Sequence, residues 1–276
     1  MARQTQPLTR DARAPHYDLS VIVPVHNEAG SIEKVLRDIS GKILSQFPGT
    51  AEVVVAEDGS TDGTKELLAC LQPELGFRLV SGNERKGYNR ALKDALSLAR
   101  GKHVFLSDSG GGHEMSDFLL MYPFATEFEV VSGFKKERKD PAHRIVLSRM
   151  YNRFVSLLFR HIFYDIDSGF KMYQKEALDQ VLAQVGTLQE CISTEIVLRM
   201  FHNGCKVKEI PVTHYQRNFV GPAKTFTYRK LPRIVGRLFW DLLKLRKELK
   251  SSSLSKKALH PAGIISNSSP KGPPSP

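Results

Sequence analysis

The residues best equipped for chemistry follow a short apolar run near the middle of the chain. Residues 104–106 predict a strand buried on both faces, and Asp108 follows almost at once, leading into three glycines, His113 and Glu114. Parallel sheets bind ligands beyond the carboxyl ends of their strands, so this carboxylate is expected at an open sheet edge, where it can hold a divalent cation. The same small residues also form ordinary solvated turns, so the stretch alone leaves both interpretations open.

Three earlier stretches repeat this order of apolar run, polar loop and amphipathic helix. The runs are 19–24, 52–56 and 77–81, and the loops after them are 25–28, 57–64 and 83–90. Strands that alternate with helices predict an α/β fold with a mainly parallel central sheet and helices on both faces. All four loops then share one edge, which gathers charged residues suited to a nucleotide with a metal-bound diphosphate: Glu28, Asp58, Arg85, Lys86 and Asp108. Arg85 and Lys86 are alternatively a solvated surface pair.

Composition limits the class of protein. The chain has 276 residues, 41% hydrophobic and 25% charged, which predicts one domain of about 200 to 230 residues with appendages. Cys70, Cys191 and Cys205 are odd in number and lack paired spacing, which argues against disulfides or a zinc site and favours a cytoplasmic location. No run approaches the ~18 to 20 apolar residues that cross a bilayer.

The net charge of +11 is concentrated near the C-terminus. Residues 224–257 hold eleven Lys and Arg against Asp241 and Glu248. Such a surface attracts phosphates, anionic lipid or nucleic acid. No aromatic-rich basic motif supports nucleic acid, so no nucleic-acid partner is predicted, and the oligomeric state stays open.

Five motifs in register resemble a known enzyme family. They are residues 23–28, 57–64, 108–110, 148–153 and 165–173. The first three resemble the family 2 glycosyltransferases, which implies their Rossmann-like glycosyltransferase-A fold. The last two resemble the dolichol-phosphate mannose synthase branch and its polyprenyl-phosphate relatives.

The resemblance implies a site for a nucleotide-sugar donor. Glu28 and Asp58 match residues that contact the nucleobase and ribose, and Asp108 matches the first carboxylate of the family's Asp-x-Asp element at the diphosphate and metal. The donor-binding residues predicted in this way are Pro24, His26, Asn27, Glu28, Asp58, Arg85, Lys86, Asp108 and Ser109.

The chain departs from the family pattern at the metal. Gly110 replaces the second Asp, and Gly112 stands where the mannose synthase branch often has Gln. A glycine offers only its backbone carbonyl as a ligand. We therefore expect Mg²⁺ or Mn²⁺ to rest on Asp108, with His113 or Glu114, and to bind weakly or atypically.

An apolar helix and the motif after it are expected to form the acceptor side. The helix is predicted over 145–163, with Arg144, Arg149, Arg153 and Arg160 along it, which either snorkel from an ordinary helix or meet a lipid phosphate. The predicted acceptor-binding residues are Lys136, Arg144, Arg149, Ser168 and Lys224.

Two carboxylates in this region are candidates for catalysis. On an extended segment Asp165 and Asp167 would share a face, and one of them would act as a base for a hydroxyl acceptor. An ionised phosphate acceptor needs no base, and the pair would then position it. Alternatively, one of them caps a turn before Gly169.

A later segment, residues 213–217, resembles the family's His-Tyr-x-Arg element. By that resemblance Arg217 stabilises charge on the leaving nucleoside diphosphate, aided by Lys224 or a metal, while His214 is equally well explained as a hydrogen-bonded strand residue. Glu195 matches an acid in the family's corresponding helix. The catalytic residues predicted overall are Asp108, Asp165, Asp167 and Arg217.

The C-terminal part predicts a basic amphipathic helix. We expect a flexible N-terminus at 1–16, a catalytic domain at 17–224, the helix at 225–250 and a disordered tail at 251–276. The helix places Trp240 near a basic face. It either lies in a membrane interface, presenting the protein to lipid-linked substrate, or packs against the catalytic domain.

These features predict an inverting hexosyltransferase. The expected reaction moves a sugar from a nucleoside diphosphate to a polyprenyl phosphate, dolichyl or undecaprenyl, in the cytoplasm or at the cytoplasmic face of a membrane. One alternative is transfer to a hydroxyl of a saccharide or soluble acceptor in cell-envelope polysaccharide synthesis. Another is a catalytically degenerate nucleotide-binding protein, because Gly110 and Gly112 replace metal ligands.

Overall fold

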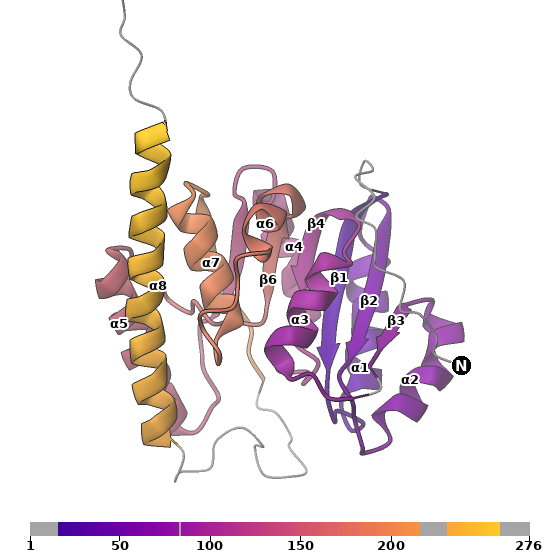
Figure 1. Ribbon diagram of the computed structural model, residues 1–276. Helices are drawn as coiled ribbons and strands as arrows, with labels where there is room; N and C mark the ends of the chain where they lie inside the picture. The colour runs from indigo at the N-terminus through magenta and orange to yellow at the C-terminus, as the bar shows by residue number, and fades with distance from the viewer. Residues whose placement is uncertain (1–15, 83, 216–230, 260–276) are drawn as a thin grey trace, which may run out of the picture.

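A seven-stranded sheet forms the centre of the molecule (Figure 1). The computed structural model describes residues 16–82, 84–215 and 231–259. The strand order is β3-β2-β1-β4-β6-β5-β7, and within it β6 alone runs antiparallel to its neighbours. The prediction of a mainly parallel sheet is confirmed.

The first half of the chain alternates strands and helices as predicted. Its elements are β1 (Tyr17–Val25), α1 (Ile32–Asp38), the π-helical η1 (Ile39–Leu44), β2 (Ala51–Glu57), α2 (Thr64–Leu75), β3 (Arg78–Ser81), α3 (Tyr88–Ser97) and β4 (Gly101–Leu106). Local residues set the ends of α2. Asp62 Oδ1 accepts a hydrogen bond from Thr64 N (3.2 Å) at its start, and Gly76 ends it with a left-handed backbone (φ 66°).

The second half departs from the prediction in three places. Its main elements are β5 (Val130–Lys135), α5 (Ala142–Phe159), β6 (Lys171–Gln174), α6 (Lys175–Leu182), α7 (Ile192–His202), β7 (Val207–Val212) and α8 (Leu231–Leu259). The sequence of residues 117–128 predicts one helix, but three short turns form over 115–124 instead, since Pro123 has no N–H to continue a helix. They are η2 (Met115–Asp117), α4 (Phe118–Met121) and η3 (Tyr122–Phe124). The sequence did not predict α6, and α8 continues beyond residue 250. The N-terminal residues 1–15 and the tail from 260 lie outside the described residues.

The register of the parallel strands brings their carboxyl ends to one edge. Val25 of β1 pairs with Glu57 of β2, which in turn pairs with Ser81 of β3. On the other side of β1, Ile22 pairs with Leu106 of β4. The loops that follow these four strands therefore leave the sheet side by side.

Two hydrophobic cores cover the two faces of the sheet. Val21 and Val23 of β1 belong to the core beneath α1, α2 and α4, whereas Ile22 belongs to the core beneath α3, α5, α6, α7 and α8. Burial on both faces explains why the strands read as continuous apolar runs.

Helix α8 packs against the α/β domain, which is one of the two alternatives that the sequence left open. Leu242, Leu245 and Leu249 are buried in the core that α7 shares. Arg199 of α7 forms an ion pair with Glu248 of α8 (3.1 Å). Among the described helices, none combines the length and the apolar content that spanning a bilayer requires.

Candidate active site

Hydrogen bonds join the loops after β1 and β2. Asn27 N donates to Ser60 Oγ (2.9 Å), and Thr61 N donates back to Asn27 Oδ1 (2.7 Å). Asn27 has a left-handed backbone (φ 55°), which Asn tolerates better than most residues. Nδ1 of His26 lies 2.8 Å from the Asp58 carbonyl oxygen. The structure thus brings predicted donor-binding residues of the two loops together.

The buried Asp58 carboxylate holds the loop after β3. Its two oxygens accept hydrogen bonds from Lys86 N (2.6 Å) and Gly87 N (2.9 Å). The Lys86 ammonium forms an ion pair with the Asp94 carboxylate (Nζ to Oδ2, 2.7 Å), and the side chain of Arg85 is exposed. Asp58 therefore meets the backbone of this loop, while the two predicted cations extend toward solvent.

Glu57 stabilises the same corner and was not predicted as a site residue. Its buried carboxylate accepts hydrogen bonds from Ser60 N and from Ser81 Oγ (3.0 Å), and Lys65 lies 3.8 Å away. Burial raises the pKa of Glu57, but the hydrogen bonds from Ser60 and Ser81 outweigh it and hold this pKa below its usual value. Glu57 therefore fixes the loop around Asp58 in its ionised form.

Ser31 connects the loop after β1 to the loop after β4. Its Oγ lies 2.7 Å from Glu28 Oε2 and 3.1 Å from the Ser109 carbonyl oxygen. The half-buried Glu28 is thereby placed next to the loop that carries Asp108. Pro24 is buried within β1, two residues before His26.

Asp108 lies at the carboxyl end of β4 and is half-buried. Its Oδ1 accepts a hydrogen bond from Gly110 N (2.7 Å). On its other side, a Cβ added to Gly169 would stand 3.4 Å from Asp108 Cβ. The segment 165–169 therefore packs directly beside Asp108, which brings the predicted donor and acceptor sides together.

The residues around Asp108 do not form a complete metal-binding set. Nδ1 of His113 lies 3.9 Å from Asp108 Oδ2, and its ring stacks on Phe170 (5.0 Å between centroids). Gly110 and Gly112 contribute no side-chain ligand. Across the residues that the structure describes, no three His, Cys, Asp or Glu side chains lie close enough together to hold a metal ion. The structure brings the predicted pair of Asp108 and His113 together, and within the described residues no third His, Cys, Asp or Glu side chain completes a metal-binding set with them.

The segment 165–168 is a turn, so the expected extended arrangement of Asp165 and Asp167 is wrong. Ser168 N donates to the Asp165 carbonyl oxygen (3.1 Å). The cause lies in β7, where Glu209 accepts the N–H groups of residues 164 and 165 (2.9 Å each) and bends the chain. Ser168, a predicted acceptor-binding residue, is buried inside this turn.

Asp167 lies at the surface of the turn. Its Oδ1 accepts a hydrogen bond from Thr194 Oγ1 (3.1 Å). The pKa of Asp167 is raised, chiefly because the surrounding protein desolvates its carboxylate. The positive charge of Lys171 lowers this pKa and the negative charge of Asp165 raises it, but neither reverses the net rise. Since the residue is also exposed to solvent, it is the better placed of the two acids to accept a proton.

Lys171 is a fully buried cation that sequence reasoning missed. It lies on β6, and its ammonium donates to the Ser168 carbonyl oxygen. Burial lowers the pKa of Lys171 to about 8, against the opposing charges of Asp167, Asp165 and Glu209. One amine therefore balances three carboxylates beneath the turn. The available signal was a lysine at the start of β6, between the apolar residues Phe170 and Met172.

Arg138 is a second residue that sequence reasoning missed. Its guanidinium lies 3.2 Å from Asp140 Oδ2 and 4.0 Å from Asp165 Oδ1, and it donates to Ser148 Oγ. Arg144 lies 4.0 Å from Asp140, so a predicted acceptor-binding residue belongs to the same cluster. The other predicted acceptor-binding cations among the described residues, Lys136 and Arg149, are exposed.

Residues 213–215 are tied to the loop after β4. His214 forms an isolated β-bridge with His113, and Tyr215 N donates to the Gly112 carbonyl oxygen (2.9 Å). His214 is thus a hydrogen-bonded bridge residue, the second of the alternatives for it. Two further predictions, Arg217 and Lys224, lie outside the described residues.

Glu114 reinforces this tether. Its carboxylate accepts hydrogen bonds from Tyr215 Oη (3.1 Å) and Lys42 Nζ (2.8 Å). Burial raises the pKa of Glu114, but the bonds from Lys42, Ser116 and Tyr215 outweigh it and bring this pKa to about 2. A carboxylate so fully engaged stabilises the loop and is a poor candidate for a metal ligand.

Glu195 is buried in α7 and fixes a loop. It accepts the N–H groups of residues 186, 187 and 188 (3.0, 3.1 and 2.7 Å), and Arg199 Nε lies 2.8 Å away. That loop in turn accepts hydrogen bonds from the side chain of Asn89, two residues after Gly87. The acid that the family resemblance matched therefore has a structural role.

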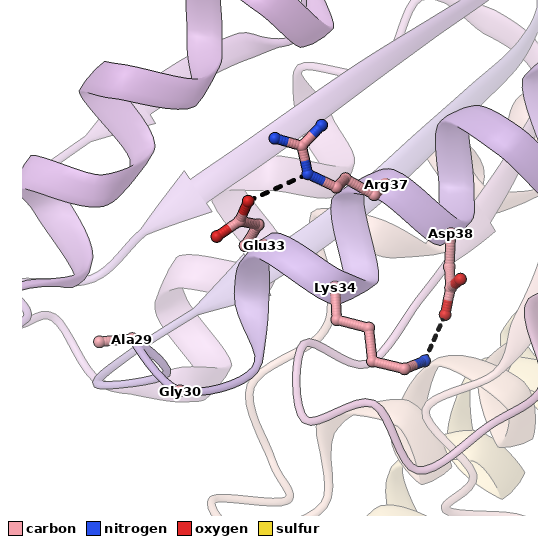
Figure 2. A pocket seen from close by; sticks show the side chains of 6 residues that line it. All are labelled: Ala29, Gly30, Glu33, Lys34, Arg37 and Asp38. Carbon is pink, nitrogen blue, oxygen red and sulfur yellow. Dashed lines mark hydrogen bonds and ion pairs between the residues drawn. The ribbon is translucent and has the colours of Figure 1, made fainter.

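A recess beside the loop after β1 does not take part in this site. Figure 2 shows that its lining comes from the start and outer face of α1, with the pairs Glu33–Arg37 (3.0 Å) and Lys34–Asp38 (2.6 Å). Its charged groups already neutralise one another, so it offers no obvious ligand chemistry.

Comparison with known proteins relates the chain to glycosyltransferases. A family model described as glycosyl transferase family 2 matches residues 20–182. The glycosyltransferase AglD of Haloferax volcanii is 31% identical over 220 residues, covering 77% of this chain and 35% of AglD. A dolichyl-phosphate beta-glucosyltransferase of Saccharomyces cerevisiae is 25% identical over 224 residues, covering 72% of this chain and 67% of that protein. The chain thus spans only about a third of AglD.

A solved structure agrees in fold. It is glucosyl-3-phosphoglycerate synthase from Mycobacterium tuberculosis, solved in complex with Mn²⁺, uridine diphosphate and glucosyl-3-phosphoglycerate. The TM-score is 0.61 at 19% sequence identity, and the match covers 84% of this chain and 81% of the other. At this identity the likeness establishes the arrangement of the sheet and helices.

Proposed function

The chain belongs to glycosyl transferase family 2 and has the glycosyltransferase-A fold, and we propose that it transfers a sugar from a nucleoside diphosphate to a polyprenyl phosphate. One observation carries this proposal: the loops of Glu28, Asp58 and Asp108 meet beside the turn 165–169. The sequence relative that acts on dolichyl phosphate supports the class of acceptor.

Glu28 and Asp58 are proposed to bind the nucleoside, and Asp108 to face the diphosphate. The hydrogen bonds between the loops of His26, Asn27 and Asp58 support this assignment, because they pre-form a polar surface at the sheet edge. Arg217 is proposed to stabilise negative charge on the leaving nucleoside diphosphate. It lies two residues after Tyr215, whose backbone is tied to the Asp108 loop.

The proposed chemistry is a single displacement with inversion. An acceptor oxygen forms a bond to the anomeric carbon while the bond from that carbon to the diphosphate oxygen breaks. The nucleoside diphosphate leaves with the bonding electrons. A phosphate acceptor is already ionised, so in this reaction Asp167 and the neighbouring Asp165 orient the acceptor, and the cations Arg138, Arg144 and Arg149 attract it.

A second candidate is transfer to a hydroxyl group, which Asp167 favours. Its raised pKa and exposure suit a general base, which would take the hydroxyl proton as the sugar–oxygen bond forms. The phosphodiester and glycoside products differ in acid lability, so product analysis separates the two reactions.

We propose that any divalent metal binds weakly to the free protein. Asp108 and His113 would be its side-chain ligands, and a hard cation usually has more oxygen ligands than this pair offers. The metal would neutralise charge on the donor diphosphate when both are bound. We also propose a cytoplasmic location, to which the three free cysteines give some support.

The first test is thermal unfolding with a panel of nucleoside diphosphates and their sugars, with and without Mg²⁺ or Mn²⁺. A ligand at ~100 times its dissociation constant adds about 2.7 kcal/mol to stability, so a true donor is visible. The shift should disappear in Asp58→Asn and persist in Glu127→Gln, which changes an exposed carboxylate far along the chain. No shift with any nucleotide contradicts the proposed donor site.

The second test measures transfer of labelled sugar from the stabilising donor to a short isoprenyl phosphate or to a panel of saccharides. We expect an acid-labile lipid product, abolished in Asp108→Asn. Transfer only to hydroxyl acceptors favours the second candidate. Binding without transfer to either class of acceptor favours a nucleotide-binding protein that has lost catalysis.

A further inference from the structure

Helices α5 and α8 lie side by side at one end of the molecule (Figure 1). Phe154 of α5 packs against Phe239 of α8, with 5.0 Å between the ring centroids. The buried contacts of α8 with the domain use Leu242, Leu245 and Leu249. Trp240 and the outer side of α5 remain uncovered by any described part of the chain.

Exposed apolar side chains are concentrated on this pair of helices. Eight of the eleven large apolar or aromatic side chains that the described residues expose belong to α5, to α8 or to the short connection after α5. They are Val146, Met150, Leu157, Ile162, Tyr164, Val235, Phe239 and Trp240. Leu157, Ile162 and Trp240 are 78%, 71% and 69% exposed. We call these eight residues and the cations between them the α5–α8 face.

The α5 part of this face is both apolar and cationic. Val146, Met150 and Leu157 fall on one helical stripe, and Arg149 and Arg153 lie within the same exposed arc. Residues 142–162 contain no acid. No acidic side chain of this segment therefore offsets the arginines.

The α8 part adds a Trp among further cations. Trp240 has the exposed Arg233, Arg237 and Lys244 on the same side of the helix. Two acids of α8 are near Trp240 in sequence: Glu248 is already engaged by Arg199 (3.1 Å), and Asp241 is half-buried with its Oδ2 atom hidden from solvent. The combination of aromatic, aliphatic and cationic groups on one surface matches the headgroup region of a membrane, where Trp and long basic side chains are stable.

We infer that the α5–α8 face docks flat on an anionic lipid bilayer. Charge decides between a bilayer and a second copy of the chain. In a two-fold dimer the face would meet itself, which would place the Arg149 and Arg153 rows of both copies close together. An anionic surface instead attracts them, with a contribution from each cation that salt weakens.

The docked orientation also gives a reason for the exposure of an aromatic side chain beside the candidate acceptor side. Tyr164, 65% exposed and stacked on Phe134 (5.1 Å), immediately precedes Asp165. The apolar face therefore continues to the edge of the candidate acceptor side, where a lipid substrate would enter from the bilayer. The inference rests on surface residues and does not require the proposed reaction.

Vesicle sedimentation of the full chain tests the inference. Vesicles of phosphatidylcholine with about 30% phosphatidylglycerol should bind the protein, and pure phosphatidylcholine should bind it at least about tenfold more weakly. The double change Leu157→Glu with Trp240→Glu should weaken binding to anionic vesicles by about tenfold or more. Leu120→Glu is the matched control, since Leu120 is 56% exposed on α4, over the opposite face of the sheet.

Three outcomes would overturn the inference. They are no binding of the unchanged protein, equal binding to neutral and anionic vesicles, or equal losses in Leu120→Glu and the double variant. A dimer that the double variant converts to monomer, without vesicle binding, would assign the face to a second copy. Transfer to a short isoprenyl phosphate in solution should be unchanged in the double variant, so a failure of docking and a failure of the proposed reaction are distinguishable.

Discussion

Replacing Glu195 by Ala should destabilise the protein more than any change at an exposed charge. The carboxylate is fully buried, accepts three backbone N–H groups and pairs with Arg199 at 2.7 and 2.8 Å. Removing one partner of a buried ion pair costs about 3 to 5 kcal/mol, because the other charge stays buried with less compensation. Arg199 would keep only the half-buried Glu248 (3.1 Å) as an acidic partner. The loop N–H groups at 186–188 would add to this loss unless water reaches them.

We therefore expect Glu195→Ala to lower the free energy of unfolding by about 4 kcal/mol, a large fraction of the 5 to 15 kcal/mol of a typical domain. Urea unfolding with linear extrapolation measures this difference. Glu190→Ala is the control. It removes an exposed carboxylate five residues earlier and should stay within about 0.5 kcal/mol of the unchanged protein.

A second substitution separates the ion pair from the loop contacts. In the double variant Glu195→Ala with Arg199→Met, the buried guanidinium that has lost Glu195 is removed as well, so part of the lost stability should return. A loss below about 1 kcal/mol in Glu195→Ala would refute the reasoning, as would a double variant less stable than the sum of its parts. Nucleotide binding should also weaken in Glu195→Ala, because the loop contacts Asn89 near the Asp58 corner.

Glu114→Gln should lower the free energy of unfolding by about 3 kcal/mol at neutral pH, because the pKa of Glu114 is depressed in the folded state. The unchanged protein has this extra stability above pH 4.5 and loses it as the pH falls toward 2. Unfolding measured at several pH values tests this difference. Lys171→Met should remove the cation that lowers the pKa of Asp167 and Glu209, so the pKa of both carboxylates should rise further in the folded state. Its stability should therefore fall as the pH rises from about 5 to 7, and a variant with no such fall would contradict the shared role of Lys171. Gly133→Ala should lower the free energy of unfolding by about 1 to 3 kcal/mol, because the added Cβ would stand 2.9 Å from a Val212 side-chain atom and 3.0 Å from a Phe170 side-chain atom. Gly41→Ala is the control, since no atom lies within 4 Å of the added Cβ and no such loss of stability is expected. Calorimetric titration with Mn²⁺ should show weak binding without nucleotide, and tight stoichiometric binding would contradict the incomplete ligand set around Asp108.

The sequence predicts the strand-end loops well, for a physical reason. Buried parallel strands such as β1 and β4 require continuous apolar runs, and the alternation with helices fixes which ends of the strands share an edge. The meeting of the loops of Glu28, Asp58 and Asp108 follows from that topology. The break at Pro123 was equally readable, since proline cannot continue a helix, but the prediction overlooked it.

The acceptor side depends on contacts between distant segments and was harder to predict. The turn at Asp165 forms because Glu209, on β7, accepts its N–H group. The position of Arg138 has no local signature and the burial of Lys171 has only a weak one, because each depends on carboxylates that the fold brings from elsewhere. A charge in an apolar run was the one available warning.

The antiparallel strand β6 determines the order in which the sheet can be completed during synthesis. Among the described strands, β5 (Val130–Lys135) pairs with β6 and β7 and no other, and both of these emerge later from the ribosome. Until Lys171–Gln174 has been translated, the nascent chain carries β5 with both of its edges unpaired, and β4 also lacks its partner β6 on one edge. Unpaired apolar edges are where nascent chains aggregate or recruit chaperones. Because the turn at Asp165 leads directly into β6, this turn is made just before β5 gains its first partner, and the other edge of β5 stays unpaired until β7 has been translated.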